Sequence, residues 1–164
     1  MAWNMRGQCV MIKFENRYGI ESVDAFLRLY GDILREKFAE NGSDSDSQGY
    51  PDVIYFRPLP DEENEYGDVV VKLDDSVYIS ERQIGKMGFS MPELFAILAH
   101  ELGHILYHTH PWGFDSEERA DSLAAELGLG SQMISALERI IASRRFRNVT
   151  SALVRRIQFL QHLA

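Results

Sequence analysis

The segment AILAHELGHILYHTH, residues 96–110, constrains the fold of this chain most strongly, because it places four of the five histidines in an otherwise apolar stretch. His100 and His104 are four residues apart, slightly more than one helical turn, so on a helix both imidazoles project from the same side. Imidazoles packed among apolar side chains need polar partners. A metal ion shared by both rings would supply one.

The residues before this segment predict where its helix begins. Ser90 can cap the helix, Pro92 suits the first turn, and Glu93 stands three residues after Ser90, which completes a capping box. The apolar run LFAILAHELGHILYH follows directly, and HPWGFD interrupts the pattern. We therefore predict a helix from about Ser90 to His108.

The rest of the chain predicts one α+β domain over residues 1–164. Its length of 164 residues is enough for one ordinary core. Apolar residues recur at helical spacing in one segment near the N-terminus, and short β-branched runs follow it. We expect a small sheet between a first helix and a helical C-terminal half, with helices at 20–41, 116–127, 131–144 and 148–163 and strands at 52–56, 68–73 and 76–80. Residues 1–50 either belong to this fold or cover the cleft of a latent form.

Composition narrows the class of protein. The single cysteine excludes an intramolecular disulfide, and no apolar run reaches the ~18–20 residues of a membrane span. The net charge is −8, and the charges are distributed unevenly. Residues 40–75 form an acidic segment, and residues 131–164 form an arginine-rich C-terminal segment. Nucleic-acid binding would need a broader basic surface with aromatic residues among the basic ones. We expect a cytoplasmic protein with no membrane span and no nucleic-acid partner.

The motif H-E-x-x-H, residues 100–104, predicts a catalytic metal centre. His100 and His104 would hold the ion, and Glu101 lies beside it, where a carboxylate can take a proton from an activated water. A hydrolytic zinc site needs a third protein ligand and one open position. Glu117 is a candidate, because it begins a predicted helix that the chain reaches after a short connection. Asp121, one turn further on, could accept the free N–H of a ligand histidine.

His110 is the alternative third ligand, or a fourth one. The stretch HELGHILYHTH fits the pattern H-E-x-x-H-x-x-G-x-x-H except that Tyr107 replaces the glycine at which the chain turns. A left-handed tyrosine there would cost about 1–2 kcal/mol. His108 lies ~12 Å along the helix from His100, too far to share one ion with it. His162 we interpret as a structural or solvated residue.

At these residues the chain resembles the gluzincin zinc metallopeptidases, in particular the HtpX-like and ImmA/IrrE-like groups and the small minigluzincins. AHELGHILYH followed by EERADSLAAEL matches their two motifs, and the resemblance covers about residues 69–130. It implies a zincin-like fold and zinc held by His100, His104 and Glu117, with Glu101 as general base and Asp121 orienting a histidine. In the stretch SVYISERQI it implies an edge strand, in which Val77, Tyr78 and Ile79 would pair with substrate.

Those families also steady the developing oxyanion with a downstream His, Tyr or Arg. Here the candidates are Tyr107, His108, His110 and the C-terminal arginines, and the sequence does not choose among them. Our leading hypothesis is a zinc-dependent endopeptidase acting on peptides or proteins. The alternative is a non-catalytic zinc module with a closed site, in which Glu101 would have no use. A metal-free helical interaction domain would bury the histidines without partners.

Overall fold

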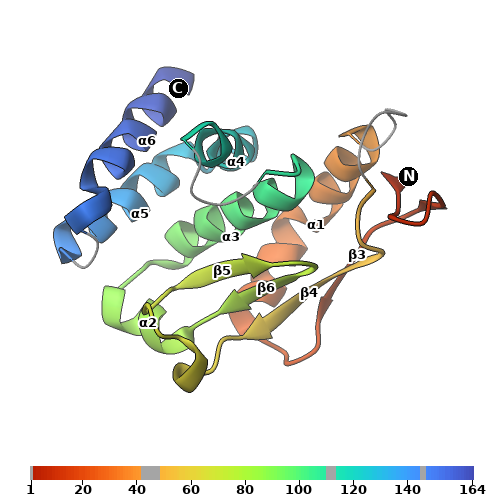
Figure 1. Ribbon diagram of the computed structural model, residues 1–164, viewed down its shortest axis with the longest axis horizontal. Coiled ribbons are helices and arrows are strands. Elements are labelled where there is room, and N and C mark those ends of the chain that lie inside the picture. Colours follow the sequence, from red (N-terminus) through yellow and green to blue (C-terminus); the bar gives the residue numbers. More distant parts are fainter. Residues whose placement is uncertain (1, 42–48, 110–113, 145–146) are drawn as a thin grey trace.

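The computed structural model describes residues 2–41, 49–109, 114–144 and 147–164. Within these residues the chain forms an α+β fold with six α-helices, two 3-10 helices and six short strands (Figure 1). In chain order these are β1 (Ala2–Trp3), β2 (Cys9–Val10), β3 (Lys13–Asn16), α1 (Glu21–Asn41), β4 (Val53–Pro58), η1 (Asp61–Glu63), β5 (Val70–Leu73), β6 (Ser76–Ile79), α2 (Glu81–Met87), α3 (Met91–Leu106), α4 (Phe114–Glu126), α5 (Gly130–Ser143), η2 (Arg147–Val149) and α6 (Thr150–Leu163).

Four strands form a mixed sheet in the order β3-β4-β6-β5. β3, β4 and β6 run parallel, and α1 provides the crossover between β3 and β4. β5 is antiparallel to β6, and a two-residue turn joins them. The first residue of that turn, Asp74, has a φ of 54°, a conformation that aspartate tolerates better than most residues. The sheet therefore ends at β3 on one side and at β5 on the other.

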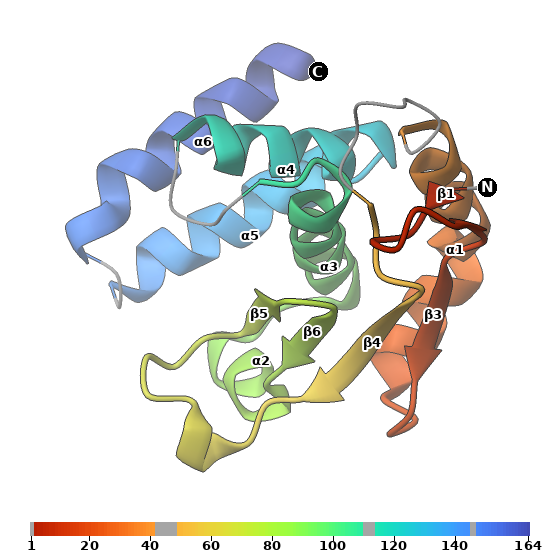
Figure 2. The same cartoon turned by 45° about the vertical axis from the view of Figure 1, so that its right-hand side comes forward.

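One face of the sheet is apolar and carries the helices. Ile54, Phe56, Val77 and Ile79 point from β4 and β6 into the core and are almost completely buried. α1 and α3 pack against this face, and α4, α5 and α6 lie on the far side of α3 (Figure 2). α3 is thus covered by the sheet from one direction and by the C-terminal helices from the other.

α3 is apolar around almost its whole circumference, because it is the central helix of the molecule. Its buried residues include Leu98, Ala99 and Leu102, each fully inaccessible to solvent. With 16 residues it is shorter than the ~20 residues of a membrane span. Among the residues that the structure describes, none of the helices is both long and apolar enough to cross a membrane.

The predicted elements are largely confirmed, but β1, β2, β3, α2 and the two 3-10 helices were not predicted. The predicted strands correspond to β4, β5 and β6, and every predicted helix is present within two residues of its expected bounds. The sheet was expected to consist of strands that follow the first helix in the chain. It also contains β3, which precedes that helix. The seven-residue helix α2 was not predicted either. In β3 the sequence KFEN has one core-facing aromatic residue among polar ones, which is too little to mark a strand.

Candidate metal centre

α3 begins with the predicted capping box and presents both motif histidines on one side. The Ser90 hydroxyl accepts from the backbone N–H of Glu93 at 3.2 Å, and the Glu93 carboxylate accepts from the backbone N–H of Ser90 at 3.0 Å. Ten residues further along, His100 and His104 have almost no exposed surface. Their Nε2 atoms lie 3.2 Å apart and face the same point in space.

α4 brings Glu117 to that point. One carboxylate oxygen, Oε2, lies 3.0 Å from Nε2 of His100, and Oε1 lies 3.4 Å from Nε2 of His104. The close approach of α4 depends on Gly103, because a Cβ atom at this position would lie 2.8 Å from Cα and from the carbonyl oxygen of Ala120. The glycine inside the H-E-x-x-H motif therefore lets the third candidate ligand reach the histidines.

The separations among these three side chains suit one small cation. Two ligand atoms at 2.0–2.1 Å from a tetrahedral zinc ion lie about 3.3 Å apart. The two Nε2 atoms lie 3.2 Å apart, and the two different oxygens of Glu117 lie 3.0 and 3.4 Å from them. With one ligand atom taken from each residue, all three atoms lie within 4.8 Å of one another. Among the described residues, His100, His104 and Glu117 form the one group of three or more His, Cys, Asp or Glu side chains that could hold a metal ion.

The Nδ1 atom of each histidine, on the ring edge away from the cluster, contacts a side-chain oxygen that orients the ring. Nδ1 of His100 lies 2.7 Å from Oδ1 of Asp121, and Nδ1 of His104 lies 2.9 Å from the hydroxyl of Thr109. Each ring can donate its Nδ1–H to that oxygen, which leaves the Nε2 lone pair free for a metal. The structure thus brings Asp121 to the place expected of it. Thr109 was not predicted: its position depends on the turn after α3, where its backbone N–H donates to the carbonyl of His104.

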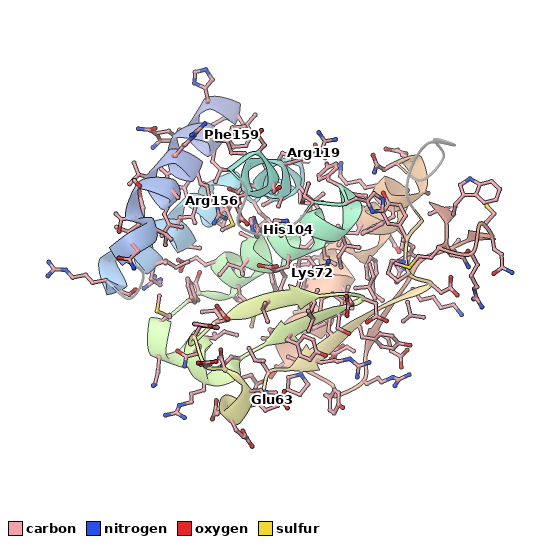
Figure 3. The ribbon with its side chains drawn as sticks, in the orientation of Figure 1. Glu63, Lys72, His104, Arg119, Arg156 and Phe159 are labelled. Carbon is pink, nitrogen blue, oxygen red and sulfur yellow. The ribbon has the colours of Figure 1, made fainter. Side chains whose placement is uncertain are left out.

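Arg156 joins the site from α6, the last helix. Figure 3 labels Arg156 on α6 and His104 on α3. The Nε and Nη2 atoms of Arg156 donate to the two oxygens of Asp121 at 2.8 and 2.7 Å, and its Nη1 lies 3.5 Å from Oε2 of Glu117. This fork geometry fixes a carboxylate in both position and orientation. The sequence analysis named the C-terminal arginines only as a group, among the candidates for the oxyanion, and Arg156 is one of them that contacts the cluster.

Electrostatic interactions within the cluster favour a cation between the histidines. Burial and the Arg156 guanidinium oppose a charge on His100, but the carboxylates of Asp121 and Glu117 outweigh them and raise its pKa to about 9. Burial likewise opposes ionisation of Glu117, yet its hydrogen bonds with His100 and His104 hold the pKa of this carboxyl well below its usual range. A metal ion would compete with protons for this position and release them on binding.

Glu101 lies beside the cluster without belonging to it. It follows His100 on α3 and is half-buried. It is not part of the group of three side chains that could share an ion. Burial raises the pKa of Glu101, and the neighbouring His100 and His104 oppose that increase only in part. A carboxylate with raised proton affinity next to a cation site has the properties of a general base.

The expected substrate strand is not at an edge of the sheet. Val77, Tyr78 and Ile79 belong to β6, which pairs with β4 on one side and with β5 on the other. Their backbone groups therefore face two neighbouring strands, and the prediction that this strand would pair with a substrate is wrong. It failed because the order of strands in a sheet is not visible in the sequence of any one strand.

Among the residues that the structure describes, the outermost strand on this side of the sheet is β5. The backbone N–H of Ser80 donates to the carbonyl of Val69 at 2.8 Å, which sets the alternation of hydrogen bonds along the antiparallel pair. Because hydrogen-bonded and non-hydrogen-bonded positions alternate, the N–H and C=O groups of Val70 and Lys72 point away from β6. β5 also packs against α3, the helix that carries the histidines.

The remaining candidate residues lie elsewhere or outside the described residues. The ring of His108 stacks on Tyr50 with 4.7 Å between centroids, and the Tyr107 hydroxyl points to Glu126. The left-handed residue after α3 is His108, with φ 50°, whereas Tyr107 has φ −98°. The chain therefore turns one residue later than the glycine pattern requires. His110 lies outside the described residues, and His162 is exposed, as expected.

Comparisons of the chain with protein-family models, with curated proteins and with solved structures gave no match. The chemistry of the site has therefore to be argued from its geometry.

Proposed function

We propose that this chain is a zinc-dependent peptidase with a zincin-like fold, which hydrolyses peptide bonds through a water molecule activated at the metal. The observation that carries the proposal is the convergence of His100, His104 and Glu117, with one ligand atom of each within 4.8 Å of the others, beside a carboxylate that is not needed as a ligand. That carboxylate, Glu101, separates a catalytic site from a structural one. A closed structural zinc site has no role for it.

The residues around the cluster divide the work of hydrolysis. Zinc bound by these three side chains would polarise the scissile carbonyl and lower the pKa of a water toward about 7. Glu101 accepts the proton of that water and passes it to the leaving amine. Asp121 keeps His100 in the tautomer that offers Nε2. Arg156 holds Asp121 through two hydrogen bonds and lies beside Glu117, so that α6 fixes the position of both carboxylates.

A peptide would bind as an added strand. The outward N–H and C=O groups of Val70 and Lys72 on β5 offer hydrogen bonds to an extended chain. A peptide added there would lie along the outer edge of β5, and β5 itself packs against α3. We propose β5, in place of β6, as the substrate strand.

The proposal is tested by zinc content and peptide cleavage in four proteins. Wild type, Glu101→Gln, Glu117→Ala and His110→Ala are purified, exposed to zinc, desalted and analysed for metal, and each is incubated with a mixed peptide library that is read by mass spectrometry. We expect about one zinc per chain in wild type, Glu101→Gln and His110→Ala. We expect much less in Glu117→Ala, and cleavage by wild type but not by Glu101→Gln.

Other outcomes would contradict separate parts of the proposal. If Glu101→Gln cleaves as fast as wild type, the general base is misassigned. If His110→Ala loses zinc and Glu117→Ala keeps it, the third ligand is misassigned. If both lose zinc and wild type cleaves nothing, the site is closed and the metal is structural.

A further inference from the structure

Lys72 is placed unusually within the edge strand. Its Cα lies opposite that of Val77, so both side chains leave the same face of the sheet. Val77 and Ile79 on that face are buried against the helices, with 0% and 1% of their surface exposed, and Val70 packs against the same core. The lysine is itself half-buried. Figure 3 labels Lys72 and His104 on the adjoining elements β5 and α3.

The ammonium group has no acidic partner in the part of the chain that the structure describes. The ion pairs closer than 4.0 Å there include those of Lys37, Arg82 and Arg139, and none involves Lys72. A positive charge on the helix-facing side of a sheet is costly unless a negative group or water compensates it. Lys72 therefore offers an unused positive charge at the edge where the peptide strand would bind.

The strand register says which residue of a peptide would meet this charge. The backbone of Lys72 points to the free edge, so a peptide residue hydrogen-bonded to it stands directly opposite. Directly opposed residues share a face, with Cβ atoms about 4.5–5.5 Å apart in antiparallel pairs. The side chain of that peptide residue would point toward α3, next to the lysine.

We propose that Lys72 makes this site select peptides with an aspartate or glutamate at the position opposite it. The proposal rests on the peptidase function above and names its substrate class. The preference is confined to one position, because acidic residues precede and follow β5 in the chain and so lie near both of its ends. Asp61, Glu62, Glu63, Glu65 and Asp68 precede the strand, and Asp74 and Asp75 follow it. A peptide with a run of acidic residues would meet these groups and be repelled.

The test measures binding separately from catalysis. The zinc-loaded full chain with Glu101→Gln is titrated with fluorescein-labelled octapeptides of alanine and threonine, in which one position at a time is Asp, Asn or Lys, and Kd is read from fluorescence anisotropy. At one position only, we expect Asp to bind roughly two- to fivefold more tightly than Asn, the size typical of a cross-strand charge pair. An octapeptide with four consecutive Asp residues should bind more weakly than the best single-Asp peptide.

Variants at Lys72 assign the preference to this side chain. Lys72→Met keeps the apolar stem and should abolish the preference, and Lys72→Glu should reverse it in favour of Lys at the same position. Lys86→Glu, a charge reversal at an exposed lysine on α2, is the matched control and should leave the preference intact. Circular dichroism and zinc content confirm that each variant is folded.

Three results would overturn the inference: no position prefers Asp, the preference survives Lys72→Glu, or none of the octapeptides binds. The proposed function fails by a different measurement, when wild type neither retains zinc nor cleaves the peptide library. Cleavage by wild type without charge preference would reject the role of Lys72 and keep the peptidase. If the preference depends on Lys72 but wild type cleaves nothing, the role of Lys72 in binding is kept and the peptidase function is rejected.

Discussion

Gly103→Ala should separate the two helices that build the candidate metal centre. The added Cβ would lie 2.8 Å from Cα and from the carbonyl oxygen of Ala120, whereas ordinary contacts begin at 3.4 Å. The obstruction is backbone, so no side chain can rotate away. α4 must move from α3 by roughly 0.6 Å, and metal–ligand distances tolerate only about 0.2 Å. Glu117, which α4 carries, would move with the helix.

Two opposing effects set the size of the change. Overpacking a core costs about 1–3 kcal/mol, and replacing a helical glycine by alanine returns up to about 1 kcal/mol. We expect a net loss of about 1–2 kcal/mol in the free energy of unfolding of the zinc-free protein. For a chain of this size that lowers Tm by about 2–8 °C. Zinc affinity, measured by competition with a chromogenic chelator, should fall at least about tenfold, as it does when groups that orient ligands are disturbed.

Gly85→Ala is the matched control. Gly85 is also helical, in α2, but a Cβ there meets nothing within 4 Å. This substitution should leave zinc affinity unchanged and stabilise the protein by about 0.5–1 kcal/mol. If Gly103→Ala behaves like this control in both measurements, the spacing of α3 and α4 does not govern the site, and our account of Gly103 is refuted.

Three further predictions concern stability. Although burial opposes its ionisation, hydrogen bonds from Arg139 and from the helix cap lower the pKa of Glu93 from 4.5 to about 2. Glu93→Gln should therefore cost about 1–2 kcal/mol in urea unfolding at pH 7, a figure reduced for the part-exposed arginine. Because the folded pKa is the lower one, this difference should be complete above pH 4.5 and vanish as the pH falls toward 2; a difference that is constant across this range would contradict it. Tyr50→Phe removes the hydroxyl that donates to the Leu106 carbonyl and should cost about 1 kcal/mol, with circular dichroism unchanged. Zinc at about 100 times its Kd should stabilise wild type by about 2.7 kcal/mol in calorimetry, and an equal gain in Glu117→Ala would exclude this residue as a ligand.

The parts of the site that could be predicted are those that depend on the spacing of residues close together in the sequence. His100 and His104 lie one turn apart on a helix whose capping box is visible in the sequence, and Glu117 follows after one connection. Asp121 was predictable in the same way, because it lies one turn beyond Glu117. That zinc is the metal and that the chain cleaves peptides remain predictions, since the geometry fits them without testing them.

The parts that were missed depend on distant contacts. Arg156 is 35 residues from Asp121, and nothing local distinguishes it from the other arginines of the C-terminal segment. β6 has the sequence of a good strand wherever it lies in the sheet, so only the pairing partners show that β5 is the edge. The position of Thr109 depends on the left-handed conformation of His108. The sequence does not predict this conformation, because the residue is not glycine.

The free edge of β5 also bears on how copies of this protein avoid one another. A strand edge that accepts a peptide offers the same hydrogen bonds to the β5 of a second copy, the usual route to edge-to-edge aggregation. If two copies paired antiparallel, the acidic turn at Asp74 and Asp75 in each would face the acidic segment before β5 in the other. The carboxylates that we propose to restrict binding at this edge would therefore also repel the edge of a second molecule. This protection is electrostatic, so it weakens as salt screens the charges.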